Sequence, residues 1–180
     1  SARLSFMLPE PTSPSPALVA LLEYFAAQAG RHGAYHLLAE LEERHPAFES
    51  MRRGGFSVYA WQRIWQFSLP RQSRDGATPA WRPARPVDEV AIRGLYNSLT
   101  PPLVQAAEPL PEQSPRGLIY RKDGELLAFA EGVFGPTGIL LYPLVHPDID
   151  NVTGLLADLV LNFPNRLGRN TNVYLGSAEL

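Results

Sequence analysis

Residues 139–163, ILLYPLVHPDIDNVTGLLADLVLNF, hold an apolar run, a proline and then apolar residues at helical spacing. The run from Ile139 to His146 predicts a strand. The helix that follows has its predicted inner face at Val152, Leu155, Leu156, Leu159 and Phe163. A polar loop, residues 165–172, separates this helix from a last predicted strand at Val173 to Leu175. Because a helical connection usually joins parallel neighbours of one sheet, the end of the chain predicts a strand-helix-strand unit.

The start of the chain has the same kind of elements. Residues 2–8 alternate as a strand does, and a helix is predicted to begin with Ser15 as its cap and Pro16 in its first turn. The apolar stripe of this helix consists of Leu18, Leu21, Leu22, Phe25 and Ala29. A second strand is predicted over residues 35–41, as a parallel neighbour of the first.

The two ends of the chain are therefore interpreted as an internal duplication. Both have a strand, proline, a helix and a strand in the same order, and both close on Ala-Glu-Leu, at residues 39–41 and 178–180. In this interpretation Phe6 and Val145 occupy equivalent central strands.

The middle of the chain supplies the rest of the predicted fold. A short helix is predicted from Pro46 to Gly54-Gly55, and a second helix is opened by Asp88 and Glu89. A hairpin is predicted over residues 118–134, with Asp123-Gly124 as its turn. Together these elements predict an α+β protein with a central mixed sheet flanked by helices.

Residues 56–67 are predicted to form one long strand. The aromatic residues Tyr59, Trp61, Trp65 and Phe67 share one parity and hence one face of that strand. This face is expected either to be covered by helices or to serve as an aromatic ligand platform.

The predicted domain organisation follows from a linker-like segment. Residues 68–80 are rich in proline, arginine and small polar residues, so the chain is divided into residues 1–67 and 81–180 around them. The chain begins with Ser1 just before a strand pattern and stops at Leu180 in another. Because a domain seldom starts and ends within a sheet, we expect a fragment of a longer protein.

Composition excludes several classes of partner and site. With 19% charged residues, a net charge of −2 and no basic run, the sequence argues against nucleic-acid binding. It has no cysteine, which excludes disulfides, thiolate metal sites and a cysteine nucleophile. It has no apolar run near the roughly 20 residues of a membrane span, so a cytoplasmic protein is expected. His32 and His36 have metal-like spacing, but Gly33 between them separates a helix end from a strand, so no metal site is predicted.

The order of elements from Trp81 to Pro147 resembles the opening of a GNAT-superfamily N-acetyltransferase. The resemblance rests on two motifs. One is the acidic-glycine hairpin turn Asp123-Gly124, and the other is Val145-His146-Pro147, at the end of the strand that corresponds to the fourth strand of that family. Residues 2–67 resemble the closing part of that fold, with Arg53-Gly54-Gly55-Phe56 in place of its glycine-phenylalanine signature. Three arrangements fit: a tandem of partial domains, one permuted sheet, or a dimer that exchanges the two parts.

The resemblance implies an acyl-CoA-dependent N-acyltransferase that uses acetyl-CoA and acts on a small-molecule amine or a peptide. Leu144, Val145 and His146 would pair with the pantetheine arm. The helix start at Asn151, Val152, Thr153 and Gly154 would receive the pyrophosphate, as helix N-termini do for anions. On the two preceding strands, Glu131 is the expected base for the amine and Tyr142 the other ionisable residue near the substrate.

The sequence also departs from the pattern of the family. Its glycine-rich pyrophosphate loop is missing from both copies. In residues 10–16 prolines remove the amide donors, and in the second copy Asp148 and Asp150 place two carboxylates where a diphosphate would lie. Met51 stands where the family has a tyrosine general acid. The first copy is therefore predicted to be silent, any activity is expected in the second, and the alternative is a catalytically inactive scaffold or interaction module.

Overall fold

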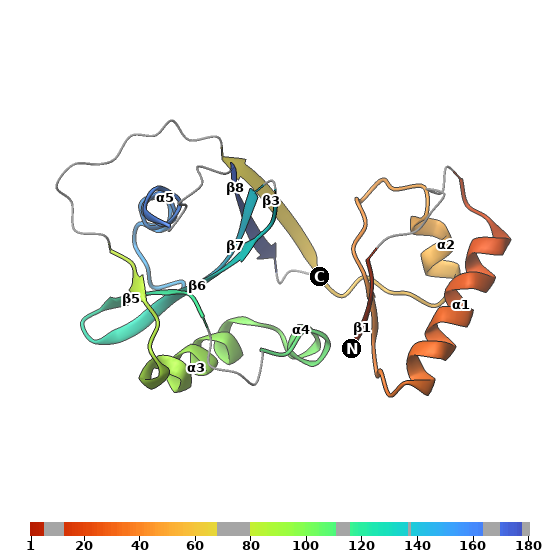
Figure 1. Cartoon of the computed structure of the whole chain (residues 1–180), viewed down its shortest axis with the longest axis horizontal. Helices are drawn as coiled ribbons and strands as arrows, with labels where there is room; N and C mark the ends of the chain where they lie inside the picture. Colours follow the sequence, from red (N-terminus) through yellow and green to blue (C-terminus); the bar gives the residue numbers. More distant parts are fainter. Residues whose placement is uncertain (6–12, 68–79, 111–115, 137, 164–169, 178–180) are drawn as a thin grey trace. The chain divides into compact units, whose positions relative to one another are not determined.

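The computed structural model describes residues 1–5, 13–67, 80–110, 116–136, 138–163 and 170–177, with the backbone alone described at 67 and 170–177 (Figure 1). The chain divides into two compact units. The first comprises residues 1–59 with 106–108, and the second comprises residues 60–105 with 109–180. Each unit contains both helices and strands, so the predicted α+β class is confirmed.

The second unit is built on a six-stranded mixed sheet in the order β3-β8-β7-β6-β5-β4. Its strands are β3 Trp61–Phe67, β4 Arg82–Pro83, β5 Leu118–Lys122, β6 Glu125–Phe134, β7 Gly138–Val145 and β8 Asn170–Ser177. The β7–β8 pair is parallel and the other neighbours are antiparallel. The predicted hairpin is present as β5 and β6, and its turn residues Asp123 and Gly124 both have positive φ, 52° and 87°.

Helices cover both faces of this sheet, as Figure 1 shows for α3 and α5. On one face the helix α3, Glu89–Leu99, packs on the buried residues Ile119, Leu126 and Phe129 of β5 and β6. On the other face α5, Val152–Asn162, packs on Ala128, Ala130, Ile139 and Leu141 of β6 and β7. The short elements η1, Pro86–Asp88, and α4, Pro102–Ala107, flank α3 in the sequence. Side chains of one strand therefore reach two separate cores.

The first unit is smaller and has its own core. The strands β1, Ala2–Leu4, and β2, Leu37–Ala39, form a two-stranded parallel sheet, and the helices are α1, Pro16–Arg31, and α2, Phe48–Arg53. Its buried residues are Leu18, Leu22, Ala47 and Met51. Met51, 5% exposed, is a core residue here.

The predicted capping role of Ser15 is wrong. Ser15 has the extended backbone of an N-cap, but its side chain makes no cap hydrogen bond; instead its own N–H donates to Ser50 Oγ at 3.1 Å. The contact connects the start of α1 to α2 through the backbone of Ser15, and the Ser15 hydroxyl makes no cap bond. The predicted end of α2 holds, because the helix stops at Arg53 and Gly55 has a left-handed φ of 89°.

The strand-helix-strand order predicted for both ends is present. The elements β1-α1-β2 and β7-α5-β8 each connect two parallel strands through a helix. The first pair forms a two-stranded sheet, whereas β7 lies within the six-stranded sheet. Phe6, on which the predicted equivalence was placed, lies outside the described residues.

The predicted division at residue 67 differs from the units that the structure forms. The sequence places residues 61–67 in the first part of the chain, but β3 pairs with β8 along all seven of its residues and so belongs to the second unit. Residues 61–67 belong to the second unit because their backbone pairs with β8, although they lie nearer in sequence to the first unit. The predicted linker, residues 68–80, lies outside the described residues except for Ala80.

Candidate functional site

The parallel ladder between β7 and β8 is shorter than either strand. It pairs Gly138 to Leu141 with Asn170 to Val173, and within the described residues no further pair follows. Beyond that point β7 still pairs with β6, up to Val145 opposite Ala128. β8 likewise still pairs with β3, up to Ser177 opposite Trp61. The second half of β7, residues 142–145, is therefore paired on one side only; we call this place the β7–β8 gap.

Pro143 provides the physical reason for this gap. The N–H of His146 donates to Leu127 O at 2.8 Å, which fixes the parity of the antiparallel β6–β7 pair. By alternation, the backbone groups of residues 144 and 142 also face β6, and those of Pro143 and Val145 face β8. Proline has no N–H to donate to a ladder. The carbonyl of Pro143 and both backbone polar groups of Val145 thus lie at the gap.

Glu131 and Tyr142, the two predicted catalytic residues, are brought together. They are direct cross-strand partners on β6 and β7, so their side chains share one face. It is the face of Phe129 and Leu144, which pack in the α3 core. Both side chains are partly buried, and burial raises the pKa of the Glu131 carboxyl. A carboxyl group of raised pKa is a better proton acceptor near neutral pH.

The predicted pyrophosphate residues at the start of α5 are partly engaged with one another. The N–H of Gly154 donates to Asn151 Oδ1 at 2.9 Å, so Asn151 caps the helix. A side chain at Gly154 would collide with that of Asn151, which explains the glycine at this position. Val152 and Thr153 are exposed. The cap uses one of the N–H groups that an anion would need.

The two carboxylates flanking this helix start both have partners. Lys122 Nζ lies 3.1 Å from Asp150 Oδ2, and this hydrogen bond raises the pKa of Lys122. Asp148 donates its N–H to His146 Nδ1 at 3.3 Å, and its carboxylate lies 3.5 Å from the same nitrogen. The pairing of Asp150 with Lys122 offsets the repulsion that the sequence predicted between these carboxylates and a diphosphate.

A cavity of about 460 Å³ lies beside this helix start. It is lined by Ala80, Tyr120, Lys122, Ile149, Asp150, Asn151, Gly154, Leu155 and Asp158. Tyr120 and Leu155 belong to the α5 core, so the cavity lies on the face of the sheet opposite to Glu131 and Tyr142.

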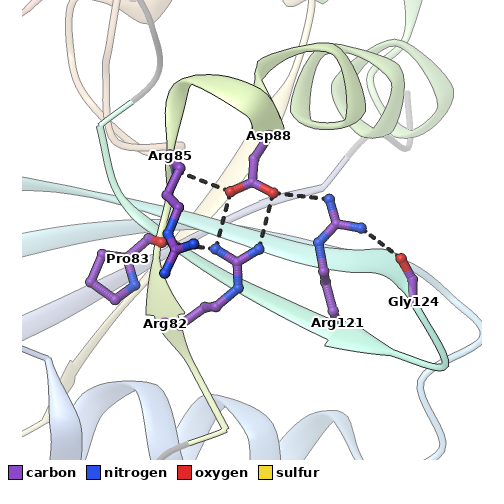
Figure 2. A network of polar contacts seen from close by, with 6 residues as sticks. All are labelled: Arg82, Pro83, Arg85, Asp88, Arg121 and Gly124. Atoms are coloured by element: carbon purple, nitrogen blue, oxygen red, sulfur yellow. Dashed lines mark hydrogen bonds and ion pairs between the residues drawn. The ribbon is translucent and has the colours of Figure 1, made fainter.

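A buried carboxylate that the sequence did not single out lies at the other edge of the sheet (Figure 2). Asp88, whose side chain is 3% exposed, accepts from both terminal nitrogens of Arg82 at 3.1 and 3.0 Å and from Arg121 at 2.9 Å. It also accepts from the N–H of Arg85 at 3.0 Å. Hydrogen bonds from Arg82 hold the pKa of Asp88 well below its usual range.

The Asp88 cluster therefore has a structural role, because it connects three elements of the second unit. Arg82, Arg121 and Asp88 come from β4, β5 and η1, and Arg121 also donates to Gly124 O at 2.6 Å in the hairpin turn. With four hydrogen bonds to its two oxygens, the carboxylate has little capacity left for a ligand or a proton. Arg82 and Arg85 lie within six residues of Asp88, but Arg121 lies 33 residues away, so the full cluster depends on the tertiary fold.

The predicted aromatic face is only partly formed. β3 begins at Trp61, and Tyr59 lies before it, with its hydroxyl donating to Glu108 at 2.5 Å in the first unit. Trp61 and Trp65 are 41% and 50% exposed, so the expected cover of helices over them is incomplete. The prediction of a shared strand face is wrong for Tyr59, because a polar partner draws it away.

The described residues offer neither a metal site nor a membrane span. Among the described residues no group of three or more His, Asp or Glu side chains could hold a metal ion. No described helix has the length and apolar character needed to cross a bilayer. His32, one of the two histidines with metal-like spacing, has its Nδ1 2.8 Å from Gln28 O within its own helix end.

No protein-family model matches this chain. No curated protein matches it either.

Proposed function

We propose that this chain is an acyl-CoA-dependent N-acyltransferase of the GNAT type, with its acyl-CoA site at the β7–β8 gap and an amine as acceptor. The observation that carries the proposal is the parallel ladder that ends at Leu141, followed by Pro143. A strand with unpaired backbone groups beside a parallel neighbour can accept an extended ligand as a further strand. The pantetheine arm, with its two amide groups, is such a ligand.

The proposed contacts of the acyl-CoA follow from the backbone of β7. The N–H and carbonyl of Val145 and the carbonyl of Pro143 are the groups that would pair with the amides of the arm. Leu144 contributes through its place in the strand, because its own backbone faces β6 and its side chain packs in the α3 core. The α5 start would lie near the diphosphate, and Lys122 would supply a positive charge beside it once released from Asp150.

The proposed chemical step is the aminolysis of a thioester. The amine nitrogen attacks the thioester carbonyl carbon, a C–N bond forms, the C–S bond breaks and the coenzyme thiolate leaves. Glu131 takes the proton that the nitrogen loses, and the thiolate is protonated from solvent. The raised pKa of Glu131 supports this assignment, because a base of ordinary glutamate pKa would accept the proton less readily. Tyr142, directly opposite, would help to orient the amine.

The first test is the binding of coenzyme A. Thermal unfolding of the chain with and without coenzyme A should show a higher Tm with the ligand, corresponding to about 2.7 kcal/mol at one hundred times the Kd. Adenosine monophosphate serves as a control for binding of the nucleotide alone. Absence of any shift at millimolar coenzyme A would remove the proposal.

One observation favours a second function, that of a non-catalytic scaffold. The Asn151 cap occupies the N–H of Gly154 at the place where the family binds its diphosphate. If the role of the cap is only to stabilise α5, this helix start binds no diphosphate, and the sheet serves as an interaction module. Replacing Asn151 by Gly leaves the N–H of Gly154 free. The replacement should strengthen coenzyme A binding in an enzyme and have no effect on ligand binding in a scaffold. A cytoplasmic location is proposed for either function, from the composition of the chain.

A further inference from the structure

The two outer edges of the six-stranded sheet differ in how they are protected. β4, at one edge, is two residues long and consists of Arg82 and Pro83. β3, at the other edge, has seven residues, WQRIWQF, with no proline, lysine or acidic residue. Short length, proline and charge are the usual means by which edge strands avoid pairing with other chains. β4 is short and contains proline, whereas β3 is long, has no proline and has one charged residue, Arg63.

The exposed side chains of β3 are unusually apolar for an edge. Trp61 and Trp65 are 41% and 50% exposed on one face, and Ile64 is 55% exposed on the other. In the described part of the chain β3 has β8 as a neighbour on one side and no strand on its outer side. A strand with an open backbone edge and large apolar side chains on both faces is suited to receive another strand.

We propose that β3 pairs with β3 of a second copy of this chain, antiparallel, about a two-fold axis through Ile64. The sequence of the strand is complementary to itself in this register. Ile64 lies opposite Ile64, and Gln62 lies opposite Gln66, so that two amides face each other. Arg63 lies opposite Trp65, where a guanidinium can rest on an indole ring.

The neighbouring register centred on Arg63 is less favourable. It places two guanidinium groups directly opposite each other, which is destabilising. The register through Ile64 keeps every arginine beside a tryptophan. Because the interface uses the same edge on both copies, it is closed, and assembly stops at a dimer with one continuous sheet.

The test uses cysteine substitution, since the chain has no cysteine of its own. In the proposed dimer the two copies of residue 64 are direct partners, with Cα atoms about 4.5–5.5 Å apart. That separation suits a disulfide. Ile64→Cys should therefore form a disulfide-linked dimer rapidly on mild oxidation. The matched control is Val90→Cys on α3, where Val90 is 83% exposed and lies outside the interface.

Solution mass completes the test. Sedimentation equilibrium of the 180-residue chain should show a monomer–dimer equilibrium. Ile64→Lys, which puts two ammonium groups opposite each other, should weaken dimerisation at least tenfold, and Val90→Lys should leave it unchanged. A chain that stays monomeric at all concentrations, open-ended aggregates, or a dimer in which Ile64→Cys cross-links no faster than Val90→Cys would each overturn the proposal.

Discussion

Leu141 of β7 and Val173 of β8 form the last pair of the parallel ladder. Two residues further along β7, Pro143 presents a backbone nitrogen without hydrogen towards β8. Pro143 thus interrupts the pairing between β7 and β8 within the sheet. Tyr142, the neighbouring residue in β7, pairs with Glu131 of β6, and α5 follows β7 in the sequence. Each of these features can be tested separately.

Replacing Pro143 by Ala supplies an N–H at the gap, and the ladder should then extend by a further hydrogen bond. We expect the new amide of residue 143 to exchange with solvent at least tenfold more slowly than an exposed amide, about 1.4 kcal/mol of protection. Hydrogen-exchange NMR measures this. Pro86→Ala, at the exposed start of η1, is the control and should give a fast amide. Fast exchange at residue 143 would contradict the explanation of the gap.

Replacing Glu131 by Gln removes the proposed base. The value of kcat/KM for acyl transfer should fall by about 10²–10⁴-fold. Glu125→Gln, on the same strand and exposed, should leave it unchanged. The pH profile of the wild type gives a second readout: the rate should decline on acidification at a pH above the ordinary range of a glutamate, because burial raises the pKa of Glu131.

Stability separates a catalytic from a structural role of Glu131. Its pKa is higher in the folded than in the unfolded chain, so the protonated form favours folding, and this contribution is lost as pH rises through the folded pKa. At pH 7 the ionised group is therefore a cost, and Glu131→Gln should have an equal or higher Tm. A lower Tm at pH 7, with activity lost in proportion, would indicate that Glu131 is structural.

Gly154→Ala and Gly94→Ala form a matched pair of helix substitutions. A Cβ at Gly154 would collide with Asn151, whereas a Cβ at Gly94 in α3 meets nothing within 4 Å. Gly154→Ala should lower the free energy of unfolding by about 0.5–2 kcal/mol, the range for a lost N-cap. Gly94→Ala should raise it by about 0.5–1 kcal/mol. Denaturant unfolding measures both changes in the free energy of unfolding. If both changes have the same sign, the Asn151 cap does not contribute to stability as proposed.

Asp88→Asn tests the buried cluster. Because the pKa of Asp88 is lower in the folded chain, its ionised form stabilises the fold above the unfolded pKa of about 3.9. This contribution is lost only as pH falls towards the folded pKa. Asp88→Asn should therefore lower Tm clearly at pH 7, with a smaller difference at pH 2. Asp123→Asn, which removes the same charge at an exposed turn, should change Tm little at either pH.

Several predictions depended on local pattern and hold in the structure. Apolar periodicity identified α1, α3 and α5, and Asp123-Gly124 identified the hairpin turn because both positions need a left-handed backbone. Local pattern failed at Ser15 and Tyr59, whose partners Ser50 and Glu108 are distant in sequence. Both residues make hydrogen bonds to distant partners that no local pattern indicates.

The sequence by itself determined the kind and order of the elements, the mixed sheet, and the parallel strand-helix-strand unit at each end, because spacing, prolines and turn residues act within a few neighbours. Only the tertiary structure decided that β3 pairs with β8, that the β7–β8 ladder ends before Pro143, and that Glu131 lies opposite Tyr142. It also decided that two arginines meet on Asp88. These features depend on strand register and on which faces are buried, and both are fixed by contacts between residues far apart in the chain.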